Sequence, residues 1–147
     1  MFNETQVGGP DHAAALAIMA RAEPQRLKQF AEMLLVEMPD IAVVTNRTGL
    51  VMVPMRDTVE NVDFHLGEVL VSEAHIADPA GNIGYGMVTG RDLEQAMAMA
   101  VIDMHLAVHG EDAATTSFLM DEKAHQAASD SLRMRQVEAT RVEMETF

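Results

Sequence analysis

The sequence predicts an α+β domain in which a four-stranded antiparallel sheet, a simple meander, packs with helices before and after it. Apolar residues recur with helical spacing before residue 40 and again after residue 89. The segment between them contains short runs of β-branched residues separated by turn residues. At 147 residues the chain suits a single domain, in which residues 1–9 are expected to be mobile.

Two helices are expected at the start of the chain. The first occupies residues 10–22 and opens at Asp11, which is a good N-cap residue. The second has Pro24 at its first position, where a missing N–H costs nothing. It continues to Val36 and ends before Pro39, since the residue before a proline disfavours the helical conformation.

The first two strands are expected in residues 41–45 and 50–55. Both runs are rich in β-branched residues, and Asn-Arg-Thr-Gly at 46–49 separates them in a pattern typical of a hairpin turn. Pro54 cannot donate a hydrogen bond to a neighbouring strand. We therefore expect Pro54 at a strand end or at the edge of the sheet.

Residues 62–77 are predicted to form the third strand, with a bulge in it. Through Phe64 the apolar residues stand at even-numbered positions, but the larger apolar residues after Gly67 stand at odd-numbered positions. An extra residue near Gly67 would return them to one face of the sheet. The turn Asp-Pro-Ala-Gly-Asn at 78–82 then leads into the fourth strand, residues 83–88.

Two further helices are predicted after the sheet. Thr89 followed by Asp92 resembles a capping box and opens a helix that continues to about His109 and stops at Gly110. This helix is apolar on most of its surface, so we expect more than one layer to bury it. A polar, alanine-rich helix is expected from Asp121 onwards.

Composition excludes several classes of function. The chain has 23 acidic and 10 basic side chains, and its net charge of -13 repels nucleic-acid phosphates and anionic lipids. The chain has no cysteine, which excludes disulfides, thiolate catalysis and cysteine-bound metal. Because no signal peptide or membrane-spanning run is recognisable, we expect a cytoplasmic protein that binds neither nucleic acid nor membrane.

Thirteen methionines suggest adaptable apolar packing, either in the core or at a contact surface. For any single methionine the core is the favoured location. The final residues, 140–147, alternate like an extended tail. Such a tail makes few contacts within its own domain and is a candidate to lie on a partner.

Gly84 and Gly86 lie on one face of the last predicted strand, directly before a helix start that carries Arg91. Glycine inside a strand marks a bulge or the close approach of a ligand or another backbone. A phosphate-binding loop is one interpretation. The spacing G-x-G-x-x-x-G does not fit it, the P-loop lysine is missing, and Asp92 stands where the anion would bind. Nucleotide binding by this loop is therefore disfavoured.

No self-contained active site can be recognised. His105 and His109 are one helical turn apart, a spacing that zinc sites use, but no glutamate follows His105. A Gly-x-Ser-x-Gly nucleophile motif is absent. Short-range carboxylate pairs are typical of solvated surface in so acidic a chain; they are Glu68 with Glu73 and Asp57 with Glu60. The sequence therefore predicts no catalytic residue, no cofactor site and no metal site.

Four segments nevertheless resemble a known family. They are Gly-Leu-Val-Met-Val at 49–53, FHLGEVLVSEAHI at 64–76, GYGMVTGRD at 84–92 and AMAVIDMHL at 98–106. In this order they resemble the G subunit of the carbon-phosphorus lyase system, PhnG. The most specific parts are the LGE segment and the GY-G-x-V-x-GRD segment, followed by the alanine-rich helix that contains Asp103. The chain departs from the family at residues 57–62, DTVENV, where relatives tend to have a Gly-Gly-x-Gly loop.

The resemblance implies an accessory subunit in bacterial phosphonate catabolism. It implies partnership with the H, I and J subunits, with the L subunit assisting. In the implied first step, attributed mainly to the I subunit, methylphosphonate displaces adenine from ATP at the ribose C1 carbon and forms α-D-ribose 1-methylphosphonate 5-triphosphate. This is a transferase reaction in which the present chain need not supply catalytic residues.

Five residues are candidates for subunit contacts under this resemblance: Gly84, Gly86, Arg91, Asp92 and Glu68. Arg91 at a helix start can make bidentate contacts to a carboxylate or phosphate, although an ordinary surface ion pair is the plainer interpretation. The backbone that approaches the two glycines can belong to this domain or to a partner. The alternative function is a stand-alone binding or oligomeric protein with a methionine-rich surface, and a hydrolase is a third. Exposed partner surfaces would also favour self-association of the isolated chain.

Overall fold

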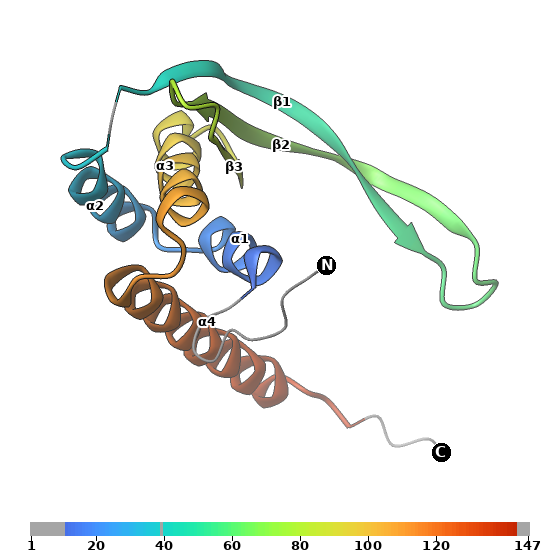
Figure 1. Ribbon diagram of the computed structural model, residues 1–147. Coiled ribbons are helices and arrows are strands. Elements are labelled where there is room, and N and C mark those ends of the chain that lie inside the picture. The colour runs from blue at the N-terminus through green and yellow to red at the C-terminus, as the bar shows by residue number, and fades with distance from the viewer. Residues whose placement is uncertain (1–10, 39, 144–147) are drawn as a thin grey trace.

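The structure, a computed structural model, describes residues 11–38 and 40–143. This part of the chain is α+β, as predicted (Figure 1). Its elements are α1 (His12–Ala20), α2 (Pro24–Leu35), β1 (Ala42–Arg56), β2 (Asp63–Ala77), β3 (Ile83–Thr89), α3 (Leu93–His109) and α4 (Ala113–Ala139). The strands form one antiparallel sheet in the order β1-β2-β3. Helix α3 packs on one face of this sheet, and α4 lies farthest from it (Figure 1).

The predicted four-stranded sheet is wrong, because the two predicted runs before residue 56 belong to one continuous strand, β1. The supposed turn at residues 46–49 pairs with β2 residue by residue. These long-range pairs outweigh the local turn preference of Asn-Arg-Thr-Gly. The chain turns instead at residues 57–62, where Asp57 accepts a hydrogen bond from the backbone N–H of Glu60 at 2.8 Å.

The predicted bulge near Gly67 is confirmed. Val53 pairs with Gly67, but the next residue, Pro54, pairs with His65, so Leu66 is the extra residue. Pro54 lies on β1, which is an edge strand, as expected for a residue without an N–H. The bulge brings the apolar residues on either side of it onto one face of the ladder.

The two leading helices lie where the sequence predicts them. Asp11 caps α1 by accepting a hydrogen bond from the N–H of Ala14 at 2.7 Å. Helix α2 begins at Pro24, with Glu23 as its N-cap. The expected mobile residues 1–9 lie outside the described residues. The same holds for 144–147, the end of the expected tail.

Helix α3 starts later than predicted, because its N-cap is Asp92 and not Thr89. Thr89 still pairs with Val71 in the sheet. Gly90 has a φ of 98°, which a residue with a side chain rarely adopts, and it turns the chain towards the helix. Asp92 then accepts a hydrogen bond from the N–H of Gln95 at 2.9 Å.

Helix α4 starts earlier than predicted, at Ala113 rather than at Asp121, with Asp112 as N-cap. Its first turns are held by burial, which overrides the weak helix preference of Thr115 and its neighbours. Phe118 stacks on Phe30 of α2, with the ring centroids 4.4 Å apart. Most of the helix after residue 122 is exposed.

Helix α3 occupies the centre of the core and is covered by more than one layer, as predicted. It contacts β2 and β3 on one side and α2 on another. Methionines lie both in the core and on the surface. Met19, Met99 and Met104 are buried, whereas Met33, Met52, Met55, Met120 and Met134 are exposed. None of the described helices combines the length and the apolar character needed to cross a membrane.

Candidate functional site

Gly84 and Gly86 face helix α3 of the same chain. A Cβ atom at Gly84 would overlap the carbonyl oxygen of Ala100 and lie 2.8 Å from the Cβ of Met104. A Cβ atom at Gly86 would overlap the carbonyl oxygen of Ala96. The two glycines therefore let the backbone of α3 lie directly on β3, and no space is left on this face for a ligand or a second backbone.

Asp92 and Arg91 have different surroundings although they are adjacent. Asp92 accepts a hydrogen bond from Nζ of Lys28 at 2.8 Å in addition to that from Gln95. These bonds, led by the one from Lys28, lower the pKa of Asp92. The side chain of Arg91 is exposed, and no hydrogen bond or ion pair joins it to another described residue. Glu68 is also exposed and lies far along β2, opposite Met52.

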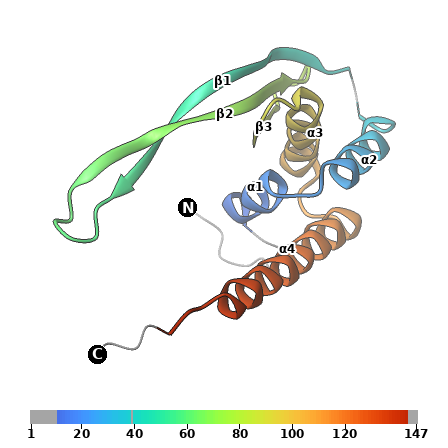
Figure 2. The ribbon, with the colours of Figure 1, turned by 180° about the vertical axis from the view of Figure 1, so that it is seen from behind.

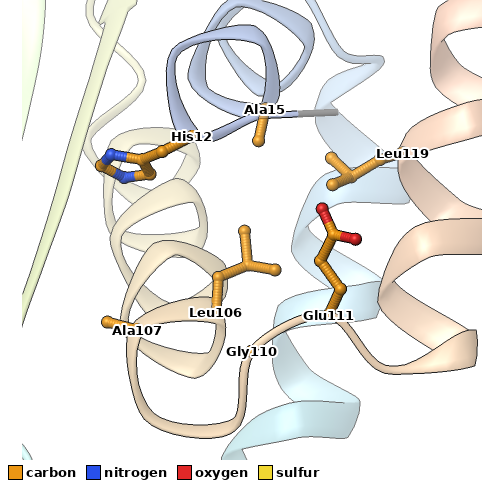
Figure 3. A pocket seen from close by; sticks show the side chains of 7 residues that line it. All are labelled: His12, Ala15, Leu106, Ala107, Gly110, Glu111 and Leu119. Atoms are coloured by element: carbon orange, nitrogen blue, oxygen red, sulfur yellow. The ribbon is translucent and has the colours of Figure 1, made fainter. Parts of the chain in front are cut away.

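An open cavity of about 290 Å³ lies between α1, the end of α3 and α4. Figure 3 shows His12 on one side of it and Glu111 on the other, with Leu106 between them. The cavity is lined by His12, Ala15, Leu106, Ala107, Gly110, Glu111 and Leu119. Its lining is thus mostly apolar, with one imidazole and one carboxylate.

His12 belongs to a histidine-aspartate pair beside this cavity. Its Nε2 lies 2.6 Å from Oδ1 of Asp103, and Oδ2 of Asp103 accepts a hydrogen bond from the N–H of Tyr85 at 2.9 Å. The Asp103 side chain is 8% exposed and that of His12 is 69% exposed. In hydrolases such a pair activates a nucleophile, but none of the seven lining residues carries a hydroxyl or a thiol. The pair thus joins α1, α3 and β3.

His105 and His109 do come together, with ring centroids 4.7 Å apart. His105 then pairs with Asp112, the N-cap of α4, at 2.6 Å between Nε2 and Oδ2. In the ranges 11–38 and 40–143, no three histidine, cysteine, aspartate or glutamate side chains are grouped so that they could hold a metal ion together. The two histidines thus mark the junction between α3 and α4.

The pKa of Asp112 reflects this junction. Burial by itself would raise the pKa, but hydrogen bonds from His105 and Thr115 outweigh it and lower the pKa from 3.8 to about 2. A lowered pKa stabilises the fold above pH 3.8, and this stabilisation is lost as the pH falls towards 2. The Asp112 side chain is 41% exposed, so solvent screening reduces the effect to about 1 kcal/mol.

Asp112→Asn should therefore be less stable than the wild-type chain at pH 6, and the difference should shrink steadily between pH 4 and pH 2. Asparagine is an equally good N-cap residue, so the substitution changes the charge and keeps the cap. Urea unfolding at several pH values measures this difference. A stability difference that is the same at pH 6 and pH 2 would contradict the lowered pKa of Asp112.

The longest surface feature is a hairpin that extends away from the helices (Figures 1 and 2). We call residues 50–70 the hairpin arm. Many of its apolar side chains are exposed: Leu50, Met52, Met55, Val59, Val62, Phe64 and Leu66. The sequence does not predict this feature, because β1 is divided there into two short strands. The residues between the two runs, 46–49, have a turn composition and give no signal for one long strand.

Comparisons with known proteins agree with the resemblance noted above. The chain matches the family described as "Phosphonate metabolism protein PhnG" over residues 11–147. It is also similar to the "Alpha-D-ribose 1-methylphosphonate 5-triphosphate synthase subunit PhnG" of Rhizobium meliloti (strain 1021). The two are 30% identical over 110 residues, which cover 74% of this chain and 70% of that protein. The chain therefore belongs to the PhnG family of phosphonate metabolism proteins.

Proposed function

We propose that the chain is an accessory subunit of α-D-ribose 1-methylphosphonate 5-triphosphate synthase and acts in phosphonate catabolism. The family match over residues 11–147 carries this proposal, together with the name of the Rhizobium meliloti relative. In the proposed reaction, a phosphonate oxygen forms a bond to C1 of the ribose of ATP. The bond from C1 to adenine breaks, and adenine leaves with the proton of the phosphonate. The complex is then a transferase.

The charge and the side chains of this chain support a non-catalytic role. The reaction joins two anions, so its transition state needs positive groups close to the phosphates and the phosphonate. A chain with a net charge of -13 is a poor source of them. Among the described residues that line the cavity beside the histidine-aspartate pair, none carries a hydroxyl or a thiol. We assign the catalytic groups mainly to the I subunit. The partners in this proposal are the H, I and J subunits, with the L subunit assisting, and the complex lies in the cytoplasm.

The predicted contact residues divide into two groups in this proposal. Arg91 and Glu68 are exposed. Arg91 contacts a partner subunit directly, and the charge of Glu68 on the hairpin arm attracts a basic partner. Gly84, Gly86 and Asp92 act indirectly, because they seat and cap α3 and so fix the loop that presents Arg91. All five residues thus contribute to assembly, and three of them do so by positioning.

The direct test is adenine release from ATP and methylphosphonate by the cognate I, H and L subunits, with and without this chain. Formation of the ribose methylphosphonate triphosphate only when the chain is added supports the proposal. Product formation that is indifferent to the chain would overturn it. Adenine release by the chain alone would contradict the non-catalytic assignment.

Arg91→Ala is expected to weaken assembly with the other subunits about tenfold while leaving the chain folded, because its guanidinium is exposed and free to form a bidentate contact. Co-purification yield and the apparent Kd measure the loss. Arg21→Ala is the matched control, since Arg21 is also exposed but already pairs with Asp130 at 2.8 Å. If the two variants assembled equally well with the other subunits, Arg91 would not be part of the interface.

The exposed methionines favour a second candidate, a stand-alone binding or oligomeric protein. Five of them lie on the described surface: Met33, Met52, Met55, Met120 and Met134. Such side chains adapt to varied apolar partners. This candidate predicts a stable homo-oligomer that does not bind the synthase subunits. Size measurement of the purified chain, alone and mixed with those subunits, separates the two candidates.

A further inference from the structure

The hairpin arm lacks the support that the rest of the sheet receives. Strand β3 pairs with β2 only from Val71 to Ala77, so residues 50–56 and 63–70 pair with each other alone. Figures 1 and 2 show this part of the hairpin reaching beyond the helices. A two-stranded ribbon with no third strand and no covering helix is only marginally stable in water. The arm therefore needs a surface to lie against.

Strand register separates the side chains of the arm onto two faces. Ala74 of β2 pairs with Gly86, which faces α3, so β2 residues of the same parity share the α3 side of the sheet. Val69 has the opposite parity and pairs with Val51. These two residues therefore lie on the sheet face that points away from α3.

The bulge extends this second face towards the tip. Because Leu66 is an extra residue, Phe64 returns to the same face as Val69 and pairs there with Met55. All the side chains in this row are apolar, and we call them the apolar strip: Val51, Val53, Met55, Phe64 and Val69. The charged and polar side chains of the outer arm lie on the opposite face: Arg56, Asp63, His65 and Glu68.

The strip is open to solvent at its outer end. Met55 is 44% exposed and Phe64 is 43% exposed, although the two lie directly opposite each other and shield one another. A continuous apolar row on one face of a hairpin is the pattern of a sheet surface that another layer covers. The opposite face is mixed, because its charged side chains alternate with apolar ones: Leu50, Met52, Pro54 and Leu70. Within residues 11–38 and 40–143, no helix or strand covers it.

The charges around the strip indicate what covers it. Asp57, Glu60, Asp63 and Glu68 border the arm, and the single arginine there, Arg56, already pairs with Asp63 at 2.8 Å. Two copies of the chain, each with a net charge of -13, would repel each other when packed strip to strip. A partner with an apolar surface and a rim of lysine or arginine side chains would be attracted instead.

We propose that the apolar strip is the docking surface for another protein subunit, one whose apolar groove is bordered by basic side chains. The inference rests on the proposed function, in which the chain works beside subunits that must carry positive groups to bind phosphates and a phosphonate. The hairpin arm then lies in that groove with the strip inward and the charged face towards solvent. The acidic border directs the arm into place.

The test compares lysine substitutions on the two faces of the arm. Met55→Lys and Phe64→Lys place a charge in the strip and should each weaken binding to the co-expressed synthase subunits by about tenfold or more. Met52→Lys is the matched control, because Met52 is exposed on the same strand but on the other face. It should change the affinity less than about threefold. The unfolding temperature of each variant checks that the domain remains folded.

A second test addresses the acidic residues that border the arm. The double variant Asp57→Lys with Glu60→Lys should slow association and weaken its salt dependence, since part of the favourable steering is lost. Equal affinity of wild type, Met55→Lys and Met52→Lys would overturn the docking surface while leaving the proposed function intact. A wild-type homodimer that Met55→Lys dissociates would overturn the choice of partner. Failure of the wild-type chain to bind any synthase subunit would overturn both proposals.

Discussion

Gly84→Ala and Gly86→Ala are each expected to destabilise the folded chain by about 3 kcal/mol. Each added methyl group would overlap a carbonyl oxygen of α3, belonging to Ala100 in one case and Ala96 in the other. These are backbone atoms in the centre of the core, so they can move away only if the whole helix shifts from the sheet. Urea unfolding followed by circular dichroism measures the loss.

Gly49→Ala is the matched control, since Gly49 also lies in a strand but no atom would come within 4 Å of its added Cβ. Its stability should stay within about 1 kcal/mol of wild type. The double variant at positions 84 and 86 should not fold, because a domain has a total stability of only about 5 to 15 kcal/mol. A stable, soluble double variant would contradict the close packing of α3 on β3.

Glu122→Ala is expected to destabilise the chain by about 3 kcal/mol. The Glu122 side chain is 0% exposed and joins α4 to the beginning of α2. Its Oε2 accepts a hydrogen bond from the N–H of Glu23 at 3.2 Å, and its Oε1 lies 3.0 Å from Nε of Arg26. That second contact acts through charge, because the N–H of Arg26 does not point at the oxygen. The variant would leave a cavity and remove the partner of both groups.

Two further variants separate the causes. Glu122→Gln keeps the side-chain volume and an oxygen that accepts the hydrogen bond from the N–H of Glu23, so it should lose less stability than Glu122→Ala. The stability that it still loses measures the contribution of the charge on Glu122. Asp130 lies on the same helix as Glu122, but its side chain is exposed. Asp130→Ala removes its ion pair with Arg21 and should cost less than about 1 kcal/mol of stability. Thermal unfolding of all three variants measures these differences. If Glu122→Ala and Asp130→Ala lost equal stability, burial would not be the cause.

Local signals in the sequence predicted the elements whose ends are set by local chemistry. Pro24 marked the start of α2, and Gly110 marked the end of α3. The change of parity around Gly67 revealed the bulge, because the two-residue period of a strand makes any insertion visible. The largely apolar surface of α3 predicted that more than one layer buries it.

The misread elements are those where distant contacts override local preference. Residues 46–49 have a turn composition but are held in β1 by pairing with β2. The start of α4 has weak helix formers, and its helical form depends on the burial of Phe118 against Phe30. No local pattern could reveal the pairing of His12 with Asp103, because 91 positions separate the two residues.

The sequence alone determined that this chain is an acidic α+β domain of the PhnG family, and it marked Gly84 and Gly86 as sites of a bulge or of close approach by a ligand or another backbone. Composition, periodicity and short motifs are local properties, and they can be recognised without a fold. The tertiary structure decided that the approaching backbone is α3, and that β1 and β2 form one long arm with an apolar strip. Both depend on which distant segments meet, and the burial and pairing of the whole chain determine this.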